Sequence, residues 1–198
     1  MSVKTKASYA FYKRSDECGR VFVYRTNGTR FQPGHTQTTK HSGRKTIGVW
    51  AWFTAEGAGS IHRIVGRLNA EKYIDVLEDS LIPSAWAHYG LEPIPFVQDR
   101  SPIHTSHVVT EWFQGRPEFN LLPWPAKGAD LNPIENVWSD MVRELQHIQV
   151  MHQEELWTAV SEIWARLKRR NHYWRTLTNS MVNRLRLVRE VDGDWTKY

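Results

Sequence analysis

The chain has 198 residues, 40% of them hydrophobic, and a formal net charge of +5. This length and apolar content suit one globular domain with a sizeable core. The single cysteine, Cys18, excludes an intramolecular disulfide framework and fits a reducing compartment. No run approaches the ~20 apolar residues that a bilayer span requires, so we expect a soluble intracellular protein with no membrane partner.

The positive charge lies at the two ends of the chain. Residues 1–50 carry ten Lys and Arg against two acids, residues 51–162 seven against sixteen, and residues 163–198 nine against three. Basic ends around an acidic middle are typical of a protein that binds a polyanion and keeps carboxylates for chemistry. An ordinary surface with uneven charge has the same pattern, so composition leaves both interpretations open.

Strand patterns dominate the first third of the chain. Runs of aromatic and β-branched residues predict strands over 7–12, 20–25, 46–53 and 59–66. The polar residues between the first two strands suit a hairpin turn. A helix is then predicted from Asn69, a candidate N-cap, because apolar residues recur at helical spacing, and Pro83 is expected to follow its end.

Strands and helices alternate in the rest of the chain. Short apolar strands are predicted over 94–99 and 119–124, with a helix over about 106–114 between them. Further helices are predicted over 134–145 (after Pro133), 154–170 and 175–189. Hairpin-joined strands are antiparallel and helix crossovers give parallel pairs, so the order predicts an α/β fold with one mixed central sheet flanked by helices, and C-terminal helices at about 150–190.

Two carboxylates occupy positions typical of a cation site. Asp99 ends an apolar strand, and ligand sites in open α/β sheets gather at the carboxyl ends of strands. Glu135 lies in the first turn of a predicted helix, where the helix dipole favours an anion. If they converge, they suit Mg²⁺, which takes oxygen ligands and shares its shell with phosphate and water. A strand-ending Asp and a capping Glu are the simpler alternative.

Three sequence words carry a resemblance to a known family. They are DRSPIH (99–104), LPWP (122–125) and the unbroken DLNPIENVW (130–138). Together they resemble the catalytic core of Tc1/mariner-type transposases, which belong to the DDE superfamily of RNase H-like nucleic-acid enzymes. The resemblance covers almost the whole chain. It departs from the family at Arg100, where the family usually has Asn.

The resemblance implies a single RNase H-like domain over 1–198 and metal-dependent cleavage and strand transfer of DNA. Asp99 then corresponds to the second metal-binding carboxylate of the family and Glu135 to the third, with Mg²⁺ or Mn²⁺ as the cofactor. His104 and Asn132 are expected to support these ligands or to face DNA. For His104, a turn histidine bonded to nearby backbone is an equal alternative, and Asp130 suits a loop or cap.

The family's first catalytic Asp has no counterpart in this sequence. The family's spacing places it within residues 4–12, KTKASYAFY, which contain no acid. Asp16 and Glu17 are the nearest acids, but they fall in the expected turn at the far end of the first strand. The helix-turn-helix segments that precede the core in the family are also not found. The chain is therefore expected to be either a fragment or a decayed or domesticated core, and both predict weak or absent strand transfer.

Three functions remain open: a DNA-cleaving and joining enzyme, a DNA-binding module without catalysis, and a protein-interaction module, since transposases of this family act as multimers. Residues 163–189 carry eight Lys and Arg and no acid, so we expect a nuclear DNA-binding protein and a possible homo-oligomer. The residues expected to bind DNA are Arg166, Lys168, Arg169 and Arg170. The alternative is a solvated helix pair whose core-facing residues are Ile163, Trp164, Leu167, Leu177, Met181 and Leu185.

Overall fold

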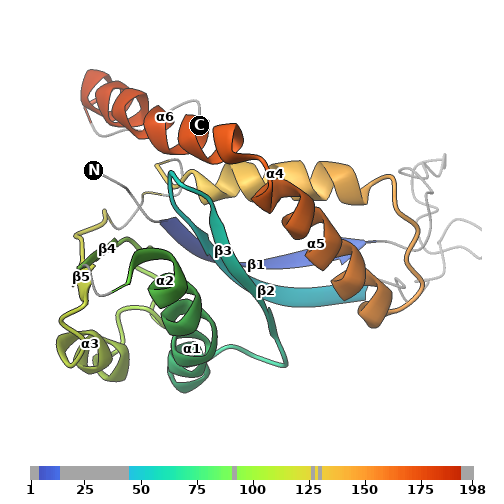
Figure 1. The fold of residues 1–198 in the computed structure, drawn as a ribbon, viewed down its shortest axis with the longest axis horizontal. Helices are drawn as coiled ribbons and strands as arrows, with labels where there is room; N and C mark the ends of the chain where they lie inside the picture. Colours follow the sequence, from blue (N-terminus) through green and yellow to red (C-terminus); the bar gives the residue numbers. More distant parts are fainter. Residues whose placement is uncertain (1–4, 14–44, 91–92, 126–127, 129–130, 193–198) are drawn as a thin grey trace, which may run out of the picture.

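The computed structural model describes residues 5–13, 45–90, 93–125, 128 and 131–192. Within them, β1 (Thr5–Lys13), β2 (Lys45–Phe53) and β3 (Ala58–Ile64) form an antiparallel sheet in that order. The register of β1 on β2 runs from Thr5 opposite Phe53 to Lys13 opposite Lys45. β4 (Ile94–Phe96) and β5 (Phe119–Leu121) form a parallel pair. Helices flank the strands (Figure 1), so the predicted α/β class is confirmed.

β2 separates two hydrophobic cores because its side chains alternate between the two faces of the sheet. Val49, Ala51 and Phe53 are fully buried in the core that contains α4 (Ile134–Leu145), α5 (Gln153–Lys168) and the start of α6 (Asn171–Glu190). Trp50 and Trp52 are buried in the other core, with residues of α1 (Ala70–Val76), α2 (Ile82–Tyr89), α3 (His107–Gln114) and β4. Figure 1 shows α4 on one side of the sheet and α1 and α2 on the other.

The sequence predicts that the helix beginning after Asn69 ends before Pro83, and this prediction is wrong, because the chain remains helical past Pro83. Asn69 caps α1 (Ala70–Val76) by accepting a hydrogen bond from the Lys72 amide at 2.9 Å. The chain then continues through a π-helical turn, η1 (Leu77–Leu81), into α2 (Ile82–Tyr89). Pro83 lies in the first turn of α2, where its missing N–H is tolerated. The wider π-helical turn before it accommodates the ring that would otherwise clash within a regular helix.

The strands depart from the expectation of one mixed sheet. Antiparallel and parallel pairs are both present, but the described residues form two separate hydrogen-bonded ladders. β4 covers only three residues rather than 94–99, and Pro95 at its centre has no N–H to donate to a second neighbour. β5 also ends early, at Leu121. The predicted strand over 20–25 lies outside the described residues.

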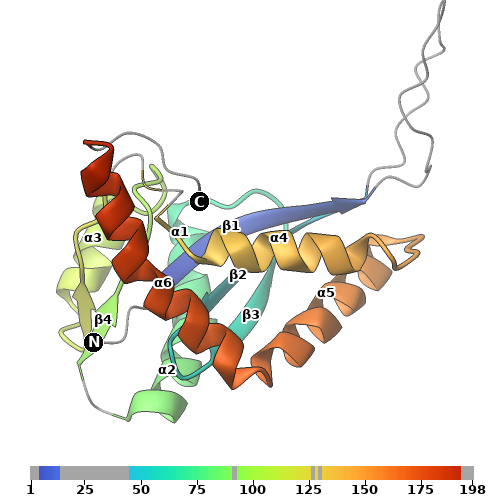
Figure 2. The ribbon, with the colours of Figure 1, turned by 90° about the horizontal axis from the view of Figure 1, so that it is seen from above.

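The remaining predicted helices are present, with small shifts at their ends. α3, α4 and α5 lie within one or two residues of the expected ranges, and α6 begins four residues earlier, at Asn171. Figure 2 shows α6 passing the N-terminal end of α4. Within the described ranges, no helix combines the length and the apolar composition that crossing a bilayer requires.

Candidate metal and nucleic-acid site

Asp99 lies three residues beyond β4, at the rim of a cavity of about 550 Å³. The preceding Val97 and Gln98 are buried, whereas the Asp99 side chain is 44% exposed. Its Oδ1 accepts a hydrogen bond from the Ser101 backbone amide at 2.9 Å, which closes a local turn. The chain therefore leaves the core at Asp99 and presents a fixed carboxylate at the surface.

The buried side chain of His104 contacts the Asp99 carboxylate. Its Nδ1 lies 2.5 Å from Asp99 Oδ1, and the residue is only 4% exposed. The ring packs against the ring of Tyr73 on α1, with 4.5 Å between the centroids. Such burial favours the role of a group that supports Asp99 over the alternative of a DNA-facing residue.

A chain of buried hydrogen bonds connects α1 to the same turn. The Tyr73 hydroxyl donates to Gln98 Oε1 at 2.6 Å, and Gln98 Nε2 donates to the His104 carbonyl at 3.2 Å. Tyr73 and Gln98 are both buried, so these bonds are shielded from water and hold one arrangement. Gln98 and Tyr73 are not recognisable as site residues from the sequence, because Tyr73 lies in an apolar helix pattern and Gln98 in an apolar strand pattern.

Glu135 projects from the first turn of α4. Its backbone amide donates to the Asn132 carbonyl at 3.2 Å, and Asn132 Oδ1 accepts from the Ile134 amide at 3.3 Å. Asn132 is 3% exposed, so its side chain organises the start of the helix inside the protein. Pro133 occupies the N-cap position between them.

The two carboxylates interact electrostatically. The pKa of Glu135 is raised above its usual range, first by burial and then by the negative charge of Asp99. A bound divalent cation would relieve this repulsion between like charges. Asp99 thus affects the charge of Glu135, although 35 residues separate them in the chain.

A buried arginine fixes the neighbouring residue of α4 and was missed by the sequence prediction. Arg184 on α6 is 1% exposed; its Nη2 donates to Asn136 Oδ1 at 2.6 Å and its Nε to Ser180 Oγ at 3.0 Å. The predicted core residue at this turn, Leu185, is instead 50% exposed. Both lie at helical spacing from the buried Met181, so periodicity alone does not choose between i+3 and i+4.

The donor set fits a hard cation that shares its shell with a substrate. Mg²⁺ often takes one or two carboxylates and completes its shell with phosphate oxygens and water. The described residues contain no group of three or more acidic, His or Cys side chains arranged for a metal. The residues of β1, TKASYAFYK, include no acid, and Asp16, Glu17 and Asp130 lie outside the described residues. Two carboxylates are therefore the ligands that the described site offers.

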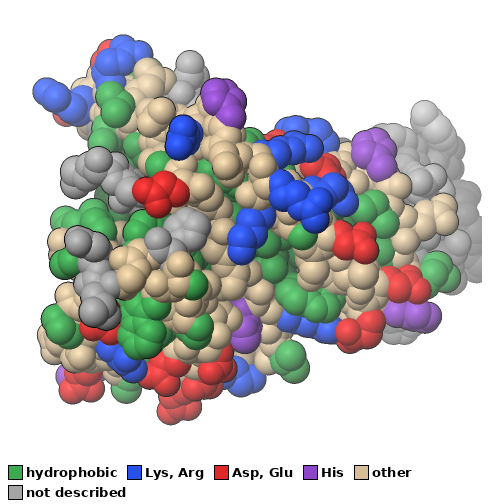
Figure 3. Space-filling model, in the orientation of Figure 1, with side chains coloured by type: hydrophobic (Ala, Val, Ile, Leu, Met, Phe, Trp, Pro, Cys, Tyr) green, Lys and Arg blue, Asp and Glu red, His purple; other side chains and the backbone are tan. Residues whose placement is uncertain are grey.

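The basic residues expected to bind DNA lie where α5 meets α6. Arg166, Lys168, Arg169 and Arg170 are all exposed. Arg166 forms an ion pair with Glu144 of α4, at 2.6 Å. No ion pair of the other three is present among the described residues. Figure 3 shows Lys and Arg side chains gathered over the region where α4, α5 and α6 lie.

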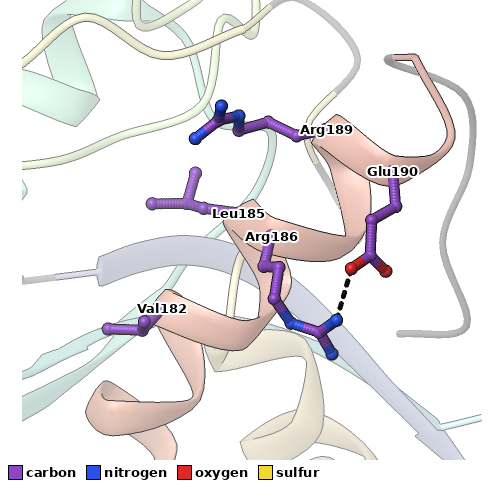
Figure 4. A pocket seen from close by; sticks show the side chains of 5 residues that line it. All are labelled: Val182, Leu185, Arg186, Arg189 and Glu190. Atoms are coloured by element: carbon purple, nitrogen blue, oxygen red, sulfur yellow. Dashed lines mark hydrogen bonds and ion pairs between the residues drawn. The ribbon is translucent and has the colours of Figure 1, made fainter.

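A second hollow, of about 620 Å³, lies along α6 and differs in character from the carboxylate site. Its described lining residues are Val182, Leu185, Arg186, Arg189 and Glu190. Figure 4 shows that all five side chains come from one helix and that Arg186 pairs with Glu190. Among the described residues, only α6 contributes side chains to this hollow.

Comparisons with known proteins agree with this arrangement. The family described as DDE superfamily endonuclease matches residues 15–157. The chain is 33% identical over 180 residues to the transposable element Tcb1 transposase of Caenorhabditis briggsae, and 31% identical to the Tc1 transposase of Caenorhabditis elegans. Each match covers 91% of this chain and 64% of the relative, so the chain spans less than two thirds of the length of these relatives.

Solved structures share the fold at lower identity. The Mos1 transposase paired-end complex with left transposon end aligns with a TM-score of 0.76 at 19% identity, covering 98% of this chain and 56% of that one. The catalytic domain of Mos1 mariner transposase aligns with a TM-score of 0.73 at 17% identity, covering 98% and 84%. The chain therefore belongs to the DDE superfamily endonuclease family, and it is similar over 91% of its length to the Tcb1 and Tc1 transposases.

Proposed function

We propose that this chain is a DNA-binding transposase core that holds one divalent cation between Asp99 and Glu135 and, by itself, does not cleave or join DNA. The proposal is carried by the position of the half-exposed Asp99 at a cavity of about 550 Å³, together with its electrostatic interaction with Glu135, which adds to burial in raising the pKa of Glu135. Mg²⁺ or Mn²⁺ is the cation, and Mos1 catalytic-domain structures with Mg and with Mn support this choice. A nuclear location is part of this proposal, because the proposed partner is DNA.

The chain's own residues define what happens at this site. His104 and the Ser101 amide hold Asp99 Oδ1 in one orientation, while the first turn of α4 holds Glu135. A cation bound there would polarise a phosphoryl oxygen and attract the DNA backbone. A second cation would need a further carboxylate, and β1 supplies none. The lack of an acid in β1 therefore favours DNA binding over DNA cleavage as the function of this chain.

The DNA is held by phosphate contacts from exposed Lys and Arg side chains. Arg166, Lys168, Arg169 and Arg170 lie together at the junction of α5 and α6, and such contacts carry little sequence information. The similarity to Mos1 complexes with transposon ends supports DNA as the partner. The paired-end complex is also the basis for proposing that this chain forms a homo-oligomer.

A second candidate function is a domesticated interaction module that keeps the fold and surfaces without catalysis. The acid-free sequence of β1 favours it, because a core that no longer cleaves DNA has no need for the first carboxylate. It differs from the first candidate in one respect, since such a module has no need to bind a divalent cation at Asp99 and Glu135.

Mn²⁺ binding to the purified chain, followed by the electron paramagnetic resonance of free Mn²⁺, tests the proposal. Wild type should bind one ion weakly, and Asp99→Ala and Glu135→Ala should abolish binding. Asp75→Ala, at an exposed acid on α1, is the matched control and should bind as wild type does. Binding unaffected by Asp99→Ala would remove the proposed site.

A cleavage assay on a terminal-repeat DNA duplex, with Mg²⁺ or Mn²⁺ present, tests the proposal that the chain by itself does not cleave DNA. No cleavage above background is expected for wild type or for Asp99→Ala. Robust activity that Asp99→Ala abolishes would contradict the proposal, and would assign the missing role to Asp16, Glu17 or a partner chain.

A further inference from the structure

The residue that departs from the family motif, Arg100, lies on the wall of the cavity beside Asp99. The side chains that line this cavity are Gln98, Asp99, Arg100, His104, Thr105, Thr110, Leu121, Leu122, Pro123 and Trp124. Arg100 is exposed, and no ion pair or hydrogen bond of its guanidinium is present among the described residues. Its positive charge is thus available to a ligand in the cavity.

The chemistry of a guanidinium selects the ligand. Its planar fork of N–H donors matches the oxygens of a phosphate in two parallel hydrogen bonds. The segment Leu121–Trp124 lines the same cavity with mostly apolar side chains, against which the sugar of a nucleotide can pack. A backbone phosphate with its attached sugar therefore fits the cavity better than a free inorganic anion.

Charge at the site points the same way. One divalent cation on two carboxylates is neutral, and Arg100 leaves the site with a single positive charge, opposite to one phosphodiester. The same guanidinium repels a cation held by the adjacent Asp99. Arg100 therefore affects phosphate binding and cation binding in opposite directions.

We propose that Arg100 is a phosphate-binding residue that contacts the backbone of a DNA strand lying in the Asp99 cavity, and that its charge weakens cation binding at Asp99. The proposal rests on the proposed function, since it assumes that DNA and a divalent cation meet at this site. In this role Arg100 supplies positive charge that a second metal ion would otherwise provide.

Arg100→Asn tests both effects in the full chain. Binding of a short fluorescein-labelled DNA duplex, measured by anisotropy at several salt concentrations with saturating Mg²⁺, should weaken. The slope of log affinity against log salt should fall by about 0.9, the value for one lost phosphate contact. Mn²⁺ affinity measured without DNA should rise, by a factor of about three to ten for a charge at this range.

Two further variants separate the outcomes. Arg67→Asn removes an exposed arginine that is not among the residues lining the cavity, and it should leave both the salt slope and the Mn²⁺ affinity at their wild-type values. Arg100→Lys keeps the charge, so Mn²⁺ affinity should stay at the wild-type value while DNA affinity is partly restored. Suppose that wild type binds DNA and Mn²⁺, but that Arg100→Asn has the same salt slope or the same Mn²⁺ affinity as Arg67→Asn. The inference about Arg100 is then overturned, and the proposed function stands. Failure of wild type to bind DNA and Mn²⁺ overturns both.

Discussion

Individual residues of the site act through their neighbours. Asp99 is oriented by His104 and by the Ser101 amide. His104 is in turn held by the ring of Tyr73 and, through its carbonyl, by Gln98. Loss of outer contacts of this kind typically lowers metal affinity by about 10–100-fold. Glu135 differs, because burial and the charge of Asp99 both disfavour its ionised form.

Replacing Glu135 with Gln should stabilise the metal-free protein at neutral pH. Because the folded-state pKa of Glu135 is raised, its favourable contribution is complete below the ordinary value of 4.5 and is lost as pH rises through the folded-state value. Gln keeps the shape and cannot ionise. The melting temperature of Glu135→Gln in EDTA should therefore exceed that of wild type at neutral pH and match it in acid.

Thermal denaturation over a pH series measures this difference. Glu162→Gln, at an exposed glutamate on α5, serves as the control and should show no such pH-dependent gain. Equal melting temperatures of wild type and Glu135→Gln at neutral pH would show that Glu135 is not under the repulsion described.

At the scale of elements, the first turn of α4 is fixed from two sides. The Asn132 side chain, in the loop before α4, accepts a hydrogen bond from the Ile134 amide. The Arg184 side chain, on α6, donates a hydrogen bond to the Asn136 side chain. Arg184 is buried, so the charge depends on its protein partners. This contact makes α6 part of the support for Glu135, although α6 supplies no ligand.

A double-mutant cycle on Asn136→Ala and Arg184→Met measures this contact. A hydrogen bond to a buried charge contributes about 1.5–3 kcal/mol, so urea denaturation should give a coupling energy of about 1–3 kcal/mol. The control cycle uses Asp140 and Arg143, an ion pair in which Arg143 is 70% exposed, and should give less than about 1 kcal/mol. Similar couplings in the two cycles would mean that α6 does not hold the turn.

The sequence predicted helices well because long periodic patterns specify them. α4 follows Pro133 and α5 keeps its apolar stripe, so each is found within one or two residues of its expected range. Local signals were less informative. Pro83 is equally suited to a helix end and to a first turn, and only packing decides that the chain continues through η1.

In the candidate site, too, some residues could be predicted from the sequence and others could not. Position in the chain and the family motif were enough to select Asp99 and Glu135 as candidates, and in the structure burial and the charge of Asp99 raise the pKa of Glu135. The contact of Tyr73 with Gln98, and the choice of Arg184 rather than Leu185 as the buried residue, depend on how α1 and α6 are rotated against the core. A single sequence carries no signal for that rotation.

Across the whole molecule, charge is distributed unevenly. The described basic residues 166–170 lie on the α5–α6 side of the sheet, while acidic residues dominate the middle of the chain. Arg166 already pairs with Glu144, so Lys168, Arg169 and Arg170 are expected to contribute most to phosphate binding. A polyanion would thus be drawn to one side of the protein.

Reversing Lys168 and Arg169 to Glu together should weaken DNA binding for every sequence tested. If each makes one phosphate contact, the slope of log affinity against log salt should fall by about 1.8. The control with the same change in net charge reverses Arg67 and Lys72, on the α1 side of the sheet. Fluorescence anisotropy with two unrelated duplexes measures both, and equal losses in the two variants would show that only net charge matters.

The alternating faces of β2 have a consequence for folding cooperativity. Trp50 and Trp52 form part of one core, while Val49, Ala51 and Phe53 of the same strand form part of the other. If either core came apart and β2 moved, the other core would lose the β2 side chains that pack within it. The molecule should therefore unfold as one unit, and a cavity opened among α4, α5 and α6 lowers the stability of the half that carries Asp99.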